Sequence, residues 1–182
     1  LREILGQEYP SLLEEASKSP PGCNGVIFLP YLMGRGTPLP VSTARGAFLN
    51  LTLSTGTGDM VRAVLEGVAF AIKDIFLGFA EVGYKLERIH ITGGGARNAL
   101  WRQIVAEVLG CPLTWAPGDA TLGAAILVSV GAGLHANIET AVAAMVHTAE
   151  TIEPEAVRVR AYEDVYLLYR ELGEGLGYLP RS

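Results

Sequence analysis

Three successive glycines, Gly93 to Gly95, lie between a β-like segment and a helical one in the stretch HITGGGARNALWRQI. Glycines before a helix let a flat ligand or a phosphate approach the backbone, whose free N–H groups favour negative charge. Asn98 follows on the predicted first helical turn, where its amide can donate and accept hydrogen bonds. The same residues would also suit a tight strand-to-helix turn. The glycines alone therefore leave two interpretations open, a ligand-binding loop and a structural turn.

Two common nucleotide-binding patterns do not fit this stretch. The chain has no GxxxxGK[ST] sequence, and Ala96, Arg97 and Asn98 follow Gly95 where a dinucleotide fingerprint needs a later glycine. The acidic residue expected on a following strand is also missing from the sequence. Because each glycine costs conformational entropy on folding, three in a row exceed what a turn needs. Together with Asn98, the glycines suit adenosine or its phosphates at a helix N-terminus, although a structural turn stays open.

Several nearby polar and aromatic residues have a structural explanation that outweighs a functional one. We expect Asp119 to be the N-cap of the next helix and Arg97 to be a solvated cation on a first helical turn. Trp101 is interpreted as a core or interface aromatic residue, and His90 as a half-exposed residue of a strand. Thr37 follows a glycine-rich loop and is a weaker candidate for lining a cleft.

Asp59 and Glu66 are acidic residues that could be taken for a catalytic pair. They lie seven residues apart on a predicted helix and share a face with Arg62. We expect this face to be solvated, with Asp59 as the N-cap of the helix.

Cysteines, histidines and overall composition narrow the class of protein. Cys23 and Cys111 form no CxxC pair, and the histidines have no metal-ligand spacing, which predicts no zinc site, no disulfide framework and a reducing cytoplasm. A net charge of −5 without a basic cluster argues against nucleic acid as a partner. The longest uncharged run, Ala120 to Leu134, is too short to span a membrane and is interpreted as a buried helix.

Periodicity predicts alternating strands and helices. Helices are expected over 1–17, 59–78, 96–109, 121–130 and 138–145, and a last helix is expected to open at EPEA with Pro154 in its first turn and to bury Tyr162, Val165, Tyr166 and Tyr169. Strands are expected in VIFLPYL, RGAFLNLTLST, RIHIT and CPLTWA. The order in the middle of the chain predicts an α/β fold with a partly parallel sheet. Ligands of such sheets bind at the carboxyl ends of the strands, where the three glycines lie.

Four segments resemble, in order, the motifs of the FGGY family of carbohydrate kinases in the actin-like ATPase superfamily. They read PGCNGVIFLPYLMGRGTP, RGAFLNLTLSTGTGDMVRAVLEGVAFAI, TGGGARNALWRQIVAEVLGCPL and GDATLGAAILVSVGAGL. The second is similar to a family signature almost throughout, with Asp59 and Glu66 at its acidic positions. The third is similar to the family's adenosine-binding segment. The sequence departs from the family at Arg35–Gly36, where the family has Glu–Arg, at Asn50, which replaces a usual glycine, and at Ser42–Thr43, which replace an aspartate and a proline.

The resemblance implies a partial α/β domain of the actin-like ATPase (ribonuclease H-like) type with a C-terminal helical extension. Residues 1–182 would form the later part of the family's C-terminal nucleotide-binding domain, with an α/β core over 18–135 and a helical tail over 136–182. In the family, the N-terminal sugar-binding domain and the catalytic aspartate lie upstream of these motifs. We therefore expect no catalytic residue in this chain and no activity from it alone.

The resemblance also implies transfer of the γ-phosphoryl group of ATP to a sugar hydroxyl, with Mg²⁺ on the phosphates. Nucleotide contacts would come from Gly93, Gly94, Gly95, Ala96 and Asn98. The expected sugar is D-xylulose, giving its 5-phosphate, and the alternatives are another ketose or polyol, such as ribulose or glycerol, or a nucleotide-binding or interaction module that has lost catalysis. The expected partners are the sugar and the protein's own N-terminal domain, with no nucleic acid or membrane, and a homodimer stays open.

Overall fold

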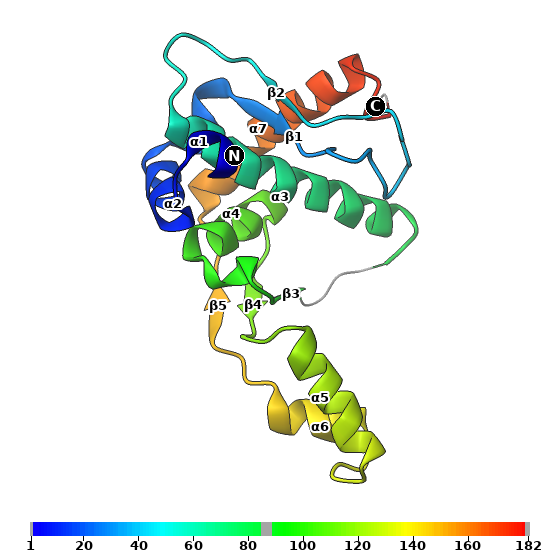
Figure 1. Cartoon of the computed structure of the whole chain (residues 1–182). Helices are drawn as coiled ribbons and strands as arrows, with labels where there is room; N and C mark the ends of the chain where they lie inside the picture. The colour runs from blue at the N-terminus through cyan, green and yellow to red at the C-terminus, as the bar shows by residue number, and fades with distance from the viewer. Residues whose placement is uncertain (1, 85–88, 181–182) are drawn as a thin grey trace.

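The computed structural model describes residues 2–84 and 89–180 (Figure 1). Its helices are α1 (Arg2–Leu5), α2 (Tyr9–Lys18), α3 (Thr57–Glu81), α4 (Ala99–Leu109), α5 (Ala120–Gly131), α6 (Ile138–Met145) and α7 (Ala156–Gly175). Its strands are β1 (Ile27–Leu29), β2 (Ala47–Leu49), β3 (Ile89–Ile91), β4 (Leu113–Trp115) and β5 (Glu150–Ile152), with short 3₁₀ turns at η1 (Cys23–Gly25) and η2 (Gly95–Arg97).

The strands form two small sheets. β1 and β2 are antiparallel, with Ile27 opposite Leu49. In the other sheet β4 is central, parallel to β3 and antiparallel to β5. The predicted β3–α4–β4 unit with parallel strands is confirmed, although Arg88 of the predicted first strand lies outside the described residues. β5 was not among the predicted strands.

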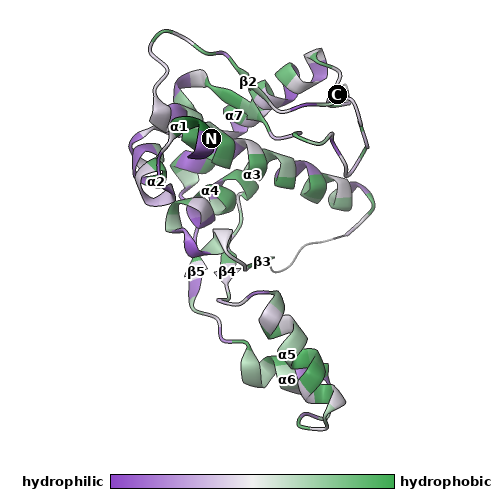
Figure 2. Cartoon of the chain, in the orientation of Figure 1, coloured by the Kyte–Doolittle hydropathy of each residue, from purple (hydrophilic) through white to green (hydrophobic). Residues whose placement is uncertain are grey.

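Helix α3 runs through the middle of the main body and contacts α2, α4, α7 and β1 (Figures 1 and 2). Its Phe70 ring lies 5.3 to 6.2 Å from the rings of Tyr162, Tyr166 and Tyr169 of α7, measured between ring centroids. All three tyrosines are buried, as predicted, whereas Val165 is only partly buried. The tyrosine-rich helix therefore packs on its own domain.

The prediction of a solvated charged face on α3 is wrong. Asp59, Arg62, Glu66 and Asp74 are all buried. The Arg62 guanidinium donates to Glu66 Oε1 at 2.7 Å and to the Ser19 carbonyl at 2.9 Å. Glu66 lies one turn further along α3, whereas Ser19 is at the C-terminal end of α2 and could not be identified from helical periodicity alone.

The N-cap of α3 also differs from the prediction. Gly56 is the N-cap, and Asp59 is the third helical residue. The Asp59 carboxylate accepts from the Gly56 N–H at 3.0 Å, from the Ser19 hydroxyl at 2.6 Å and from the Asn24 amide at 2.9 Å. Burial acts to raise the pKa of Asp59, but these hydrogen bonds outweigh burial and lower it. Asp59 thus ties the start of α3 to the turn before β1.

Other helix boundaries differ by a few residues. The expected first helix is two helices separated near Gly6, whose φ of +61° ends α1. Pro154 precedes α7 instead of lying in its first turn, because α7 begins at Ala156 after the N-cap Glu155.

The interpretation of 120–134 as a buried helix is wrong. α5 and α6 form an arm that projects from the main body (Figure 1). Of the residues of α5, only Ile126 and Ser129 are buried. The exposed large apolar side chains of the arm are Leu127, Val128, Leu134, Ile138 and Val142. No helix within 2–84 and 89–180 is long and apolar enough to cross a membrane.

Candidate functional site

The glycine turn is anchored to the loop that follows β4. The Gly93 N–H and the Thr92 hydroxyl both donate to the Gly118 carbonyl, at 3.1 and 3.0 Å. Gly93 has a φ of +88°, a conformation that side chains strongly disfavour. The need for glycine at position 93 is therefore explained by the turn itself.

The fold does not explain the other two glycines in the same way. Gly94 has a φ of −60°, and a Cβ added there would meet no atom within 4 Å. A Cβ added at Gly95 would make only ordinary contact, at 3.6 Å from Trp101 Nε1. Any small residue would satisfy the backbone and the packing at both positions. Their lack of side chains leaves the backbone open on the side that faces the cavity described below.

Asn98 is the N-cap of α4, not part of a helix that begins at Ala96 as predicted. Residues 95–97 form the separate turn η2, and α4 begins at Ala99. The Asn98 Oδ1 accepts from the Trp101 N–H at 2.8 Å. Its Nδ2 has no acceptor among the residues that the structure describes, so it is available to donate to a ligand.

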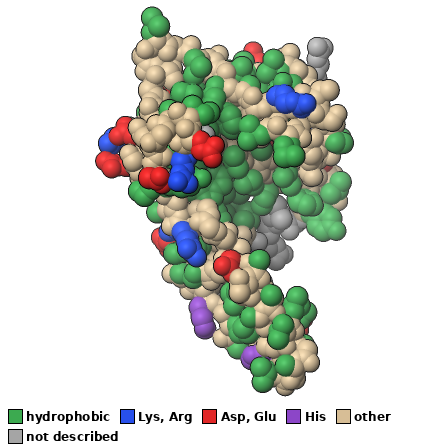
Figure 3. Space-filling model, viewed as in Figure 1, with side chains coloured by type: hydrophobic (Ala, Val, Ile, Leu, Met, Phe, Trp, Pro, Cys, Tyr) green, Lys and Arg blue, Asp and Glu red, His purple; other side chains and the backbone are tan. Residues whose placement is uncertain are grey.

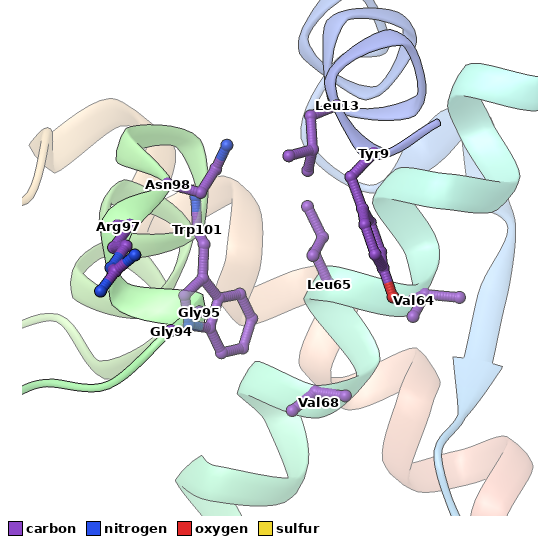
Figure 4. Close-up of a pocket in the computed structure, with 10 residues that line it drawn as sticks. All are labelled: Tyr9, Leu13, Val64, Leu65, Val68, Gly94, Gly95, Arg97, Asn98 and Trp101. Carbon is purple, nitrogen blue, oxygen red and sulfur yellow. The ribbon is translucent and has the colours of Figure 1, made fainter. Parts of the chain in front are cut away.

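A cavity of about 680 Å³ opens beside this turn (Figure 4). One wall comes from η2 and α4, and the other from α2 and α3. The lining residues are Tyr9, Leu13, Val64, Leu65, Val68, Gly94, Gly95, Arg97, Asn98 and Trp101. Most of this lining is apolar, and its polar groups other than the Tyr9 hydroxyl lie at or next to the glycine turn. Such a cavity suits a flat, largely apolar ring system with a polar edge.

The structure brings three of the five predicted contact residues to the cavity, namely Gly94, Gly95 and Asn98. Gly93 lies behind them in the turn. Ala96 is buried, and its carbonyl accepts from Arg102 Nη1 at 2.7 Å.

The α2 and α3 wall was missed from the sequence. Tyr9, Leu13, Val64, Leu65 and Val68 carry only an apolar pattern, which is the usual mark of a core. No motif distinguishes a side chain that lines a cavity from one that fills the interior. Trp101, expected in a core or an interface, is partly buried against the core and also lines the cavity.

Arg97 brings a charge to the lining of the cavity, and Asp119 lies close enough to Arg97 to interact with it. Arg97 is exposed and, among the described residues, forms no salt bridge. Asp119 is the N-cap of α5, as predicted, and accepts from the Thr121 N–H at 2.9 Å. This bond, with the Leu122 N–H, lowers the pKa of Asp119, and Arg97 adds to the effect. Arg97 is therefore the cation placed to meet an anionic group that leaves the cavity on this side.

The remaining candidates lie apart from the cavity. His90 and Thr37 are exposed, and Asp59 and Glu66 belong to the buried contacts of α3. Arg35, at the departure from the family motif, is buried, lies 3.7 Å from Asp74 and donates to the Leu39 carbonyl. Within the described ranges, no group of three or more His, Cys, Asp and Glu side chains could hold a metal ion.

A β-strand, a glycine turn and a helix N-terminus open on an apolar cavity at the carboxyl end of a parallel strand. This is the position at which α/β domains bind their ligands. Residues 3–132 match the family model for the C-terminal domain of the FGGY family of carbohydrate kinases. The chain therefore belongs to this family, and its fold is that of the actin-like ATPases.

Comparison with individual proteins points to the same family. The chain is 30% identical over 168 residues to a xylulose kinase of Staphylococcus epidermidis, a match that covers 91% of this chain and 34% of that protein. It is 33% identical to ribulokinase 2 of Staphylococcus saprophyticus, covering 92% and 32%. The solved xylulose kinase of Rhodospirillum rubrum matches with a TM-score of 0.80 at 30% identity, covering 93% of this chain and 34% of that one. The chain thus spans about a third of the length of the relatives that it matches.

Proposed function

We propose that this chain supplies the adenosine side of an ATP-dependent sugar kinase, with the base of ATP in the cavity between α2, α3 and α4. The observation that carries the proposal is the pair Gly94 and Gly95, where neither backbone conformation nor packing calls for glycine. A ligand held against the backbone would require their small size. Gly93 and Ala96 would contribute through the backbone, and the free Nδ2 of Asn98 would donate to the ligand.

The phosphoryl transfer itself needs groups that we place outside this chain. Such catalysis depends on positioning and charge neutralisation, with Mg²⁺ on the phosphates and a carboxylate that accepts the hydroxyl proton. The described residues offer no cluster of metal ligands. We propose that Mg²⁺ is held by the phosphates and by residues of the remainder of a longer protein, which also supplies the sugar site and the catalytic aspartate.

The proposed domain organisation is an α/β core over 18–135 followed by a tail over 136–182, with an N-terminal sugar-binding domain as the partner in the longer protein. We propose D-xylulose as the sugar, because xylulose kinases are prominent among the relatives. The ribulokinase match keeps a second ketose as the alternative. Phosphorylation of xylulose, ribulose and glycerol by the full-length protein separates the two.

Free cysteines support a reducing cytoplasmic setting for this proposed kinase. Cys23 and Cys111 are unpaired in the structure. Burial raises the pKa of both thiols, which keeps them protonated and unreactive.

Replacing Gly94 with valine should weaken ATP binding at least about tenfold, a loss of about 1.4 kcal/mol. The new side chain would extend from the cavity wall, and its Cβ would meet no protein atom within 4 Å. Isothermal titration calorimetry gives the affinity, and thermal unfolding should show a stability within about 0.5 kcal/mol of the original. Gly131→Ala, also in open space but on α5, is the control and should leave ATP binding unchanged. Unchanged ATP binding by Gly94→Val would contradict the proposed contact.

The purified 182-residue chain should not phosphorylate xylulose at a detectable rate, because the proposed catalytic aspartate and sugar site are outside it. A coupled assay for ADP release, run beside the full-length protein, measures this. Robust turnover by the chain alone would show that these groups are present here after all.

We propose that the α5–α6 arm lets the isolated chain self-associate, with a homodimer as the simplest product. Leu127 and Val128 are 62% and 67% exposed on neighbouring positions of α5, and clustered exposed apolar side chains favour association. Light scattering over a concentration series should show the mean mass rising, and Leu127→Lys with Val128→Lys should lower it. A constant monomer mass would refute this role of the arm.

A further inference from the structure

Two aromatic side chains face the cavity from opposite walls. Trp101 of α4 is packed partly against the core, and its backbone N–H is held by Asn98. Tyr9, the first residue of α2, stands on the other wall with its side chain directed along α3 toward Val64 (Figure 4). The two rings come from segments more than ninety residues apart in the sequence, and only the fold brings them to one space.

Tyr9 also separates this cavity from a second one. The neighbouring cavity, of about 480 Å³, shares Tyr9, Leu13, Val64 and Leu65 with the first. Arg2 lies over the Tyr9 ring, 5.4 Å from its centroid, and is held by Glu8 at 3.2 Å. Tyr9 is 61% exposed, although it lies among apolar side chains. Tyr9 therefore lines both cavities, and one flat ligand could cover its ring on the side of the first (Figure 4). Hydrophobic side chains gather on the face of the main body seen in Figure 3.

The charge of the lining tells which part of a nucleotide this space would hold. Among the described residues, Arg97 is the only charged one in the lining, and it lies at the glycine turn. The wall of Tyr9, Leu13, Val64, Leu65 and Val68 has no charge to offer a triphosphate. An aromatic ring does stack favourably on a nucleobase, because every base has a π-face.

We propose that Tyr9 is the residue that holds the base of the nucleotide, closing the cavity opposite Trp101 and Asn98. This inference rests on the proposed function and deepens it. Tyr9 is a positioning residue, because it acts on the base and not on the reacting phosphate. It follows that the chain recognises the nucleoside more than the phosphates, so adenosine binds nearly as tightly as ATP.

The test is a titration of the 182-residue chain with adenosine and with ATP, followed by tryptophan fluorescence and confirmed by calorimetry. Trp101 lines the cavity, whereas Trp115 lies under the Arg102 guanidinium at 4.1 Å. The variants are Tyr9→Phe, which keeps the ring, Tyr9→Leu, which keeps apolar bulk, and Tyr9→Ala. Tyr84→Ala is the control, since Tyr84 is 68% exposed and contacts Phe79 instead of the cavity.

We expect Tyr9→Phe and Tyr84→Ala to bind adenosine within about twofold of the original chain. Tyr9→Leu and Tyr9→Ala should lose about tenfold in affinity, the size typical of one base–aromatic stack. Thermal unfolding of each variant confirms that it is folded. If Tyr9→Ala does not fold, the affinity of Tyr9→Leu decides the test.

The outcomes separate this inference from the proposed function. Binding that Gly94→Val abolishes but Tyr9→Leu leaves intact would overturn the role of Tyr9 and keep the adenosine site. ATP binding without any adenosine binding would overturn recognition through the base. Absence of binding of either ligand by the original chain would overturn both the inference and the proposed site.

Discussion

Replacing Glu66 with alanine is expected to lower the free energy of unfolding by about 3–5 kcal/mol, the cost of leaving a buried charge without its partner. The Glu66 carboxylate accepts from Arg62 at 2.7 Å, from the Tyr162 hydroxyl at 2.9 Å and from the Gly22 N–H at 3.1 Å. Arg62 is only 3% exposed, so its loss of Glu66 leaves a buried cation. Urea unfolding followed by circular dichroism measures the change.

The same contacts keep the Tyr162 hydroxyl neutral. Burial raises the pKa of Tyr162, and the charge of Glu66 raises it further. The protonated hydroxyl donates to Glu66 and accepts from Arg62. Glu66→Gln, which keeps an acceptor, should lose less stability than Glu66→Ala.

Glu15→Ala is the matched control for Glu66→Ala. Glu15 pairs with Lys18 at 2.9 Å, but the pair is exposed and should contribute nothing measurable. Equal stability of Glu15→Ala and Glu66→Ala would mean that the buried contacts of α3 do not hold the domain together.

Replacing Gly67 with alanine should lower the free energy of unfolding by about 3 kcal/mol, at the upper end of what overpacking costs. Gly67 lies in the middle of α3, where glycine is unfavourable for a helix. A Cβ there would overlap the Phe28 carbonyl oxygen of β1 and lie 3.1 Å from its carbon. Because the obstacle is backbone, α3 and β1 would have to move apart. Urea unfolding again gives the change.

Gly123→Ala should have the opposite effect on stability, although Gly123 also lies inside a helix. Gly123 lies inside α5, and a Cβ there would meet nothing within 4 Å. Alanine should therefore raise stability by about 0.5–1 kcal/mol, the usual helical preference for alanine over glycine. Destabilisation by Gly123→Ala, or stabilisation by Gly67→Ala, would contradict the packing described for these helices.

Short sequence signals correctly predicted some helix ends and one strand pairing. Gly110, with a φ of +69°, ends α4 as its position predicts, and Asp119 caps α5. The parallel pairing of β3 and β4 followed from the alternation of strand and helix. The two caps depend on residues within a few positions of one another, and the strand pairing depends on one short strand–helix–strand segment.

Features that depend on distant partners were not predicted. The charged residues of α3 were expected in water because their acceptors and donors, Ser19, Gly22 and Tyr162, are supplied by segments far along the chain. The helix α5 was expected to be buried because it is apolar, yet nothing in the described chain covers Leu127 and Val128. An apolar composition shows that burial of the helix would be favourable, but it does not show whether another segment covers the helix.

The candidate site divides in the same way. The glycine turn and Asn98 could be found from residue types at a helix start, and the structure places Gly94, Gly95 and Asn98 on one cavity. The opposite wall could not be found, because Tyr9, Val64 and Val68 look like ordinary core residues until α2 and α3 are seen to leave a space. One wall of the site could therefore be predicted from a local motif, whereas the other depends on how α2 and α3 pack.

Titration of the isotopically labelled chain with adenosine, followed through its backbone and side-chain amide resonances, tests the central claim most directly. The account predicts shifts that gather at Gly94, Gly95 and the Asn98 side-chain amide, with little change on α5, and a weaker response in Asn98→Ser. Serine keeps an oxygen to cap α4 but removes the free amide donor, whereas Asn98→Ala removes both. Shifts that avoid the glycine turn, or none at ligand concentrations well into the millimolar range, would contradict an adenosine site in this chain.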